Sequence, residues 1–154
     1  MPGTAVAQGP RRQRWNRSMV ENVAPTQVWD ALRSNIAARL VDVRTNAEWS
    51  YVGLPDLTDS GQEPLLIPWQ VFPTMQLNKD FIDQMEQSGL TPANHVYFLC
   101  RSGVRSLAAA QAAREAGFPQ VYNILDGFEG PADGEGHRGG LAGWKADGLP
   151  WRQR

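Results

Sequence analysis

The chain has 154 residues, of which 42% are hydrophobic and 20% are charged, and its formal net charge is −1. This size and composition predict one globular domain with a hydrophobic core, and no apolar run approaches the length of a membrane span. Residues 1–17 also contain no apolar segment of the kind found in secretory signals, so we expect a cytoplasmic protein without a membrane partner.

The positive charge of the chain is concentrated near its start. Four arginines and no acidic residue give residues 1–17 a charge of +4, which leaves a charge of about −5 on the remainder. A mildly acidic body does not favour nucleic acid as a partner. We predict a disordered basic tail at 1–17, a single domain at 18–150 and a short C-terminal tail at 151–154.

Short apolar runs alternate with helical patterns along the predicted domain. The predicted strands are 19–23, 39–44, 65–69, 96–100 and 120–125. The predicted helical segments are 25–33, 45–51, 78–89 and the alanine-rich stretch that ends at Gly117. The remaining segments 53–64 and 126–143 have the composition of loops. This alternation predicts an α/β fold with a parallel sheet covered on both faces, although it does not give the order of the strands.

Two helix starts have recognisable polar residues. Thr45 is the predicted N-cap of one helical turn, with Glu48 three residues later as its capping-box partner. Asn78 is the predicted cap of the next helix, in which Leu77, Phe81 and Met85 fall on one stripe.

Asp42 and Arg44 end the second predicted strand. They are two residues apart, so their side chains share one face of the strand. One interpretation is an ordinary pair of charges at a strand end. The other is a carboxylate and a guanidinium that support a site at the carboxyl edge of the sheet.

Cys100, the only cysteine in the chain, follows the apolar run 96–99 and precedes the alanine-rich helix. The carboxyl edge of a parallel sheet is where ligands bind, because the next helix directs the free N–H groups of its first turn there. Arg101, Arg105 and the positive helix end favour the thiolate form of the cysteine, and Gly103 allows a tight turn. These features predict an anion-binding loop with a nucleophilic sulfur at its base.

Other chemistry receives little support. Gly134–Gly139 matches the dinucleotide fingerprint by letters, but no helix is predicted after it and no strand directly precedes it. One cysteine and the two separated histidines, His95 and His137, do not provide the spacing of metal ligands. We therefore expect neither a metal nor another cofactor.

The sequence resembles the rhodanese family of sulfurtransferases. The resemblance is carried by residues 40–44 with 47–49, by the segment from Cys100 to Ser106, and by 126–130 with the later pair Gly143 and Trp144. It implies a three-layer fold with a five-stranded parallel sheet. It also implies a catalytic cysteine that carries sulfane sulfur as a persulfide, from thiosulfate or a persulfide donor to a thiol or cyanide.

The resemblance assigns roles to the polar residues described above. It implies that Cys100 is catalytic, that Asp42 and Arg44 support the site, and that six residues bind the substrate: Arg101, Ser102, Gly103, Val104, Arg105 and Ser106. A small anionic sulfur donor and a thiol acceptor, which a partner protein could supply, are the implied partners. The alternatives are a non-catalytic binding or sulfur-carrier module and a phosphatase of the same fold. Related phosphatases have a loop one residue longer than the six residues from Cys100 to Arg105.

The sequence departs from the family pattern in two places. Residues 52–57 replace the usual Gly-His-Ile-Pro-Gly-Ala run, and Gly130–Gly143 is longer and richer in glycine than in compact single-domain members. We expect both departures to change the rim of the loop rather than its base. Arg138 lies in the second segment, and we expect its positive charge to attract an anion toward that rim.

Overall fold

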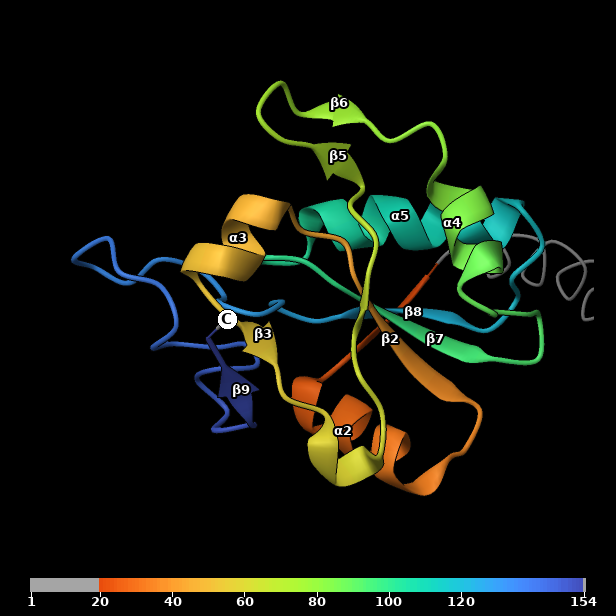
Figure 1. Ribbon diagram of the computed structural model, residues 1–154. Helices are drawn as coiled ribbons and strands as arrows, with labels where there is room; N and C mark the ends of the chain where they lie inside the picture. Colours follow the sequence, from red (N-terminus) through yellow and green to blue (C-terminus); the bar gives the residue numbers. More distant parts are fainter. Residues whose placement is uncertain (1–19, 154) are drawn as a thin grey trace, which may run out of the picture.

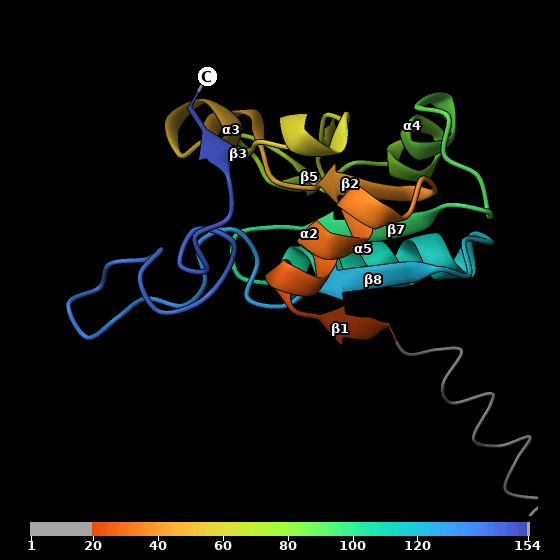
Figure 2. The ribbon, with the colours of Figure 1, turned by 90° about the horizontal axis from the view of Figure 1, so that it is seen from below.

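Five parallel strands form the central sheet of the computed structural model, which describes residues 20–153. The strands are ordered β1-β8-β7-β2-β4, and all four neighbouring pairs are parallel (Figures 1 and 2). Their bounds are β1 Glu21–Val23, β2 Ala38–Asp42, β4 Leu65–Leu66, β7 His95–Leu99 and β8 Val121–Ile124. The predicted α/β fold is confirmed, whereas the predicted tail at 1–17 lies outside the described residues.

Helices cover both faces of the sheet. Helix α2 (Pro25–Ser34) lies on one face, and α4 (Phe81–Gln87) and α5 (Val104–Glu115) lie on the other (Figure 1). Alternate residues of β7 therefore enter two separate cores. Val96 and Phe98 pack in the core that includes α4 and α5, whereas Tyr97 and Leu99 pack in the core that includes α2.

Helix α5 contacts the sheet through small side chains. Ala109, Ala110 and Ala113 are fully buried, so this helix lies close to the strands. Alanine also has the highest intrinsic helix propensity. Gly117 follows the helix with φ of 110°, a conformation that glycine adopts readily after a C-cap. The helix that follows the cysteine loop is thus held against the sheet by close packing and ends at a glycine.

The segment predicted as the loop 53–64 contains regular structure. It holds β3 (Leu54–Pro55) and the short 3₁₀ helix η1 (Thr58–Ser60). Strand β3 pairs antiparallel with β9 (Trp151–Arg152), which corrects the prediction that residues 151–154 form only a tail. Gly53 permits this pairing, because a Cβ atom at that position would lie 2.9 Å from the carbonyl oxygen of Arg152.

A second difference lies before α4. Strands β5 (Gln70–Val71) and β6 (Gln76–Leu77) form a hairpin that the sequence pattern did not predict. Leu77 therefore lies in a strand with 59% of its surface exposed, although Phe81 and Met85 are buried as predicted. The predicted cap Asn78 does not cap α4, whose N-cap is Asp80. Instead, the Asn78 side chain accepts a hydrogen bond from the backbone N–H of Asp80 and donates to the Pro68 carbonyl.

The parallel arrangement brings several connections to one edge of the sheet. The carboxyl ends of β2, β7 and β8 lead there into α3 (Asn46–Tyr51), the cysteine loop and the glycine-rich segment, respectively (Figure 1). The carboxyl edge is the place at which the predicted functional residues can meet.

Within residues 20–153, no helix has the length and apolar character needed to cross a membrane.

Candidate functional site

The sulfur atom of Cys100 lies at the base of a tight loop between β7 and α5. Gly103, the N-cap of α5, adopts φ of 116°, and its backbone N–H donates a hydrogen bond to Cys100 Sγ over 3.1 Å. The hydroxyl of Ser106, in the first turn of the helix, also lies 3.1 Å from Sγ. Cys100 is only 1% exposed and forms no disulfide. Two polar groups therefore surround a nearly buried sulfur.

The other predicted loop residues are placed differently. Arg101 is exposed, and its backbone carbonyl accepts hydrogen bonds from the N–H groups of Glu129 and Gly130. Ser102 is half-buried, and Val104 is 78% exposed. Gly103 and Ser106 thus contact the sulfur. Arg101 and Val104 contribute backbone to the loop, and their side chains are exposed to solvent.

Arg105 forms an ion pair with Glu48 of α3 across a separation of 57 residues. Its two terminal nitrogens donate to the two carboxylate oxygens over 2.6 and 2.8 Å, and each side chain is 19% exposed. Burial alone raises the pKa of Glu48, but the hydrogen bonds and charge of Arg105, together with the Thr45 N–H and the charge of Arg44, leave that pKa below its usual value. The pKa of Arg105 is raised, mainly by its hydrogen bonds to Glu48. Glu48 therefore balances much of the positive charge with which Arg105 was expected to attract an anionic donor.

Glu48 has a second function at the start of α3. Its carboxylate accepts the backbone N–H of Thr45, while the Thr45 hydroxyl accepts the N–H of Glu48. This confirms the predicted capping box. The sequence did not identify Glu48 as the partner of Arg105, because no short-range pattern connects residues so far apart. One carboxylate consequently ties α3 to the helix that follows the cysteine.

Asp42 and Arg44 form a fully buried ion pair at the end of β2. Arg44 donates from Nε and Nη2 to the Asp42 carboxylate over 2.9 and 2.6 Å, and Nη2 also donates to the carbonyl oxygen of Gly53. The guanidinium carbon lies 4.3 Å from the centroid of the Phe128 ring. Since the Phe128 N–H donates to the Cys100 carbonyl, this pair supports the backbone beside the cysteine without touching its sulfur.

The segment after β8 packs directly against the cysteine loop. Gly127 has φ of 58°, and a Cβ atom there would lie 2.7 Å from the backbone of Arg101. Its carbonyl accepts the N–H of the fully buried Trp144, so a second part of the chain holds the segment in place. These contacts explain why glycine is required at position 127, where any side chain would displace the loop.

A chain of polar groups extends from the buried sulfur to the exposed Asn22 on the edge strand β1. The hydroxyl of Ser106 lies 2.5 Å from Oδ1 of Asn123 in β8, whose Nδ2 donates to Oδ1 of Asn22 in β1. Asn22 and Asn123 are directly opposed in the parallel pair β1–β8. Sequence reasoning did not identify Asn123, because an asparagine inside a strand has no signal that distinguishes a site residue from an ordinary polar one.

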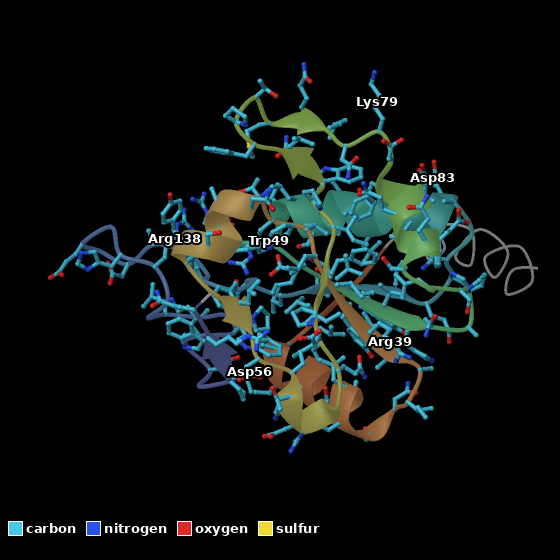
Figure 3. The ribbon with its side chains drawn as sticks, viewed as in Figure 1. Arg39, Trp49, Asp56, Lys79, Asp83 and Arg138 are labelled. Carbon is cyan, nitrogen blue, oxygen red and sulfur yellow. The ribbon has the colours of Figure 1, made fainter. Side chains whose placement is uncertain are left out.

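The glycine-rich segment beside this edge is held by its own contacts. Arg138 is exposed, and its side chain donates to the carbonyl oxygen of Gly130 over 2.7 Å. Arg138 and Trp49 lie toward the end of the molecule that carries α3, whereas Arg39 lies toward the other end (Figure 3). Among residues 20–153, no group of three or more His, Cys, Asp or Glu side chains is arranged to hold a metal ion.

The fold and the loop together define a class of protein. A parallel α/β sheet presents one cysteine at its carboxyl edge, at the start of a helix whose first N–H groups lack partners within the helix. Comparison with protein families agrees with this description, because the model for the rhodanese-like domain matches residues 24–132. The chain belongs to the rhodanese-like family.

Individual relatives cover most of the chain. The crystal structure of Rv0390 from M. tuberculosis shares 45% identity over 88% of this chain and 99% of its own, with a TM-score of 0.80. The curated protein "Uncharacterized protein RP600 homolog" of Rickettsia rickettsii is 42% identical over 86% of this chain and 98% of its own length. The polysulfide-sulfur transferase homodimer of Wolinella succinogenes has the same fold at 22% identity, with a TM-score of 0.62 over 99% of this chain and 91% of its own.

Proposed function

We propose that this protein is a sulfurtransferase that moves a sulfane sulfur through a persulfide on Cys100. One observation carries the proposal: Gly103 N–H and the Ser106 hydroxyl both lie 3.1 Å from a cysteine sulfur placed at a helix start. A hydrogen-bond donor and a positive helix end both stabilise an anionic sulfur. Membership of the rhodanese-like family supports the same chemistry.

The transfer consists of two displacements. The thiolate of Cys100 attacks the outer sulfur of thiosulfate, a new S–S bond forms, and sulfite leaves with the electron pair of the broken S–S bond. Cyanide or an acceptor thiolate then attacks the outer sulfur of the persulfide. The Cys100 thiolate leaves with its electron pair, and the product is thiocyanate or an acceptor persulfide. Neither step requires an oxidant or a metal.

The geometry favours a donor with a small terminal sulfur. Because only 1% of Cys100 is exposed, a donor has to reach the sulfur through one projecting atom. The exposed Arg101 and the start of α5 supply positive charge for an anionic donor, since Glu48 already balances Arg105. The six-residue loop is shorter than that of the related phosphatases, which makes phosphate the poorer substrate.

The acceptor has to come from outside the chain. Resolution of the persulfide by an internal thiol would require a second cysteine, and the sequence has one. We include a small thiol or a cysteine of a partner protein as the acceptor. The segment Gly130–Gly143, which contains Arg138, forms part of the rim that such an acceptor would approach, and shortening it should change the preference between acceptors.

The direct test is thiocyanate formation from thiosulfate and cyanide. Wild-type protein should form thiocyanate catalytically, and Cys100→Ser should form none while it unfolds at the same temperature as the wild type. Persulfide formation without turnover would favour the sulfur-carrier alternative. Substantial thiocyanate production by the Cys100→Ser variant would refute the proposed mechanism.

A further inference from the structure

The hydroxyl of Ser106 lies between two groups that compete for its single hydrogen. Its oxygen is 3.1 Å from Cys100 Sγ and 2.5 Å from Asn123 Oδ1. A serine hydroxyl donates one hydrogen bond, so it cannot donate to both groups at the same time. Asn123 presents its oxygen to Ser106 while its Nδ2 donates to Asn22 over 2.8 Å. The Ser106 hydroxyl therefore donates to only one of these two groups at a time.

We propose that Asn123 is a positioning residue that controls the ionisation and reactivity of Cys100 through Ser106. In the thiol state, the Cys100 S–H donates to Ser106 Oγ, and the Ser106 O–H donates to Asn123 Oδ1. When the thiol releases its proton to solvent, the hydroxyl turns and donates to the thiolate beside the Gly103 N–H. Asn123 Oδ1 then loses the hydrogen bond from Ser106.

The loaded state returns the hydroxyl to Asn123. This part of the inference rests on the proposed sulfur transfer. Once the Cys100 sulfur has formed a bond to a second sulfur, the negative charge lies on the outer atom. Cys100 Sγ then no longer attracts the Ser106 hydrogen as a thiolate does. Asn123 consequently favours the thiol and the persulfide over the free thiolate.

Burial makes this competition effective. Cys100 is 1% exposed, Ser106 is fully buried and Asn123 is 4% exposed, so bulk water has little access to a group that loses its partner. In the thiolate state the buried side-chain carbonyl of Asn123 has lost its hydrogen bond from Ser106, which costs free energy. The thiolate should therefore be less stable in the wild type than in a variant without this carbonyl. A less stabilised thiolate is also the stronger nucleophile.

Charged groups near the loop act in addition to this hydrogen bond. Arg105 interacts electrostatically with Cys100, and its own charge is opposed by Glu48 and Asp42. The charged residues on the loop, on α3, at the end of β2 and in the segment that follows β8 include Arg101, Arg105, Glu48, Asp42, Arg44, Asp126 and Glu129, and α5 and β1 also carry Arg114, Glu115 and Glu21. Substitution of the neutral Asn123 leaves all of them in place, so an effect of that substitution reports on the hydrogen bond.

The test is the rate of alkylation of Cys100 by iodoacetamide as a function of pH. Asn123→Ala should raise the rate three- to tenfold at the acidic end of the profile, which corresponds to about one net hydrogen bond, and should lower the alkaline plateau. Asn123→Leu, which retains most of the side-chain volume, should give the same result if the alanine variant does not fold. Ser106→Ala should lower the rate at the acidic end.

A double variant identifies the route of the effect. In the Ser106→Ala background, Asn123→Ala should leave the profile unchanged, because the hydroxyl that connects the two residues is absent. The matched control is Asn94→Ala, since Asn94 bonds to the Ala37 carbonyl beside the amino end of β7. That control should leave the alkylation profile of the wild type unchanged.

The result separates this inference from the proposed function. An equal effect of Asn123→Ala with and without the Ser106 hydroxyl, or no effect in either background, would overturn the role of Asn123. Alkylation requires no sulfur donor. A shifted profile in a protein that forms no thiocyanate would therefore support Asn123 and reject sulfur transfer, while an unshifted profile in an active enzyme would reject Asn123 alone.

Discussion

Replacement of Glu48 by glutamine should destabilise the protein by about 2 kcal/mol at neutral pH. Glu48 accepts two hydrogen bonds from Arg105, over 2.6 and 2.8 Å, with 19% of each side chain exposed. A hydrogen bond to a charged group contributes about 1.5 to 3 kcal/mol, whereas a fully exposed ion pair contributes less than about 1 kcal/mol. Glutamine keeps one acceptor oxygen, so the variant loses approximately one of the two charged bonds.

Urea unfolding at two pH values tests this reasoning. Because folding lowers the pKa of Glu48 from its usual 4.5, the stability that its ionisation contributes is present above that value. It is lost as the pH falls through the lower pKa of the folded state. The difference between wild type and Glu48→Gln should therefore be about 2 kcal/mol at pH 7, or about 4 to 8 °C in Tm, and should shrink below about pH 4.

Glu63→Gln is the matched control. Glu63 lies 3.8 Å from Arg152 in an ion pair in which the Glu63 side chain is 85% exposed. Its replacement should change the free energy of unfolding by less than about 0.5 kcal/mol. A Glu48→Gln effect as small as that of the control, or one that is equally large at pH 7 and pH 3, would refute the assigned role of the Glu48–Arg105 pair.

Three further substitutions test other parts of the site. Asp42→Ala should cost about 3 to 5 kcal/mol in urea unfolding, because it leaves the Arg44 charge buried without its carboxylate; a loss below about 1 kcal/mol would contradict this. Gly127→Ala should abolish thiocyanate formation by displacing the cysteine loop, while Gly140→Ala, where an added Cβ meets nothing within 4 Å, should retain it. Arg105→Ala should lower kcat/KM for thiosulfate about 5- to 150-fold, equivalent to about 1 to 3 kcal/mol, because it breaks the ion pair with Glu48 that ties α3 to the helix after the cysteine; an unchanged value would exclude this positioning role.

Local patterns predicted much of the fold. The alternation of short apolar runs and helices predicted the parallel sheet, and Thr45 with Glu48 predicted the start of α3, because both signals depend on neighbouring residues. The pairing of β3 with β9 joins residues almost one hundred positions apart, and neither two-residue strand has a periodic pattern of its own. Hairpin β5–β6 was missed for the same reason, since two-residue strands are too short to show alternation.

The candidate site could be predicted only in part. Cys100 and its loop are contiguous in the chain, so the local sequence pattern was enough to predict the sulfur at a helix start. The Asp42–Arg44 pair was predicted to share a face, but its complete burial depends on Phe128 and Gly53 from distant segments. Glu48 and Asn123 reach the loop only through tertiary structure, and a single sequence carries no signal for such contacts.

Intact mass spectrometry after incubation with thiosulfate tests the central claim most directly. The account predicts that wild-type protein gains the mass of one sulfur atom, that cyanide or a dithiol removes it, and that Cys100→Ser gains nothing. The measurement detects the covalent intermediate itself and does not depend on the identity of the physiological acceptor. Absence of the added sulfur from wild-type protein that forms thiocyanate, or its presence on Cys100→Ser, would contradict a persulfide on Cys100.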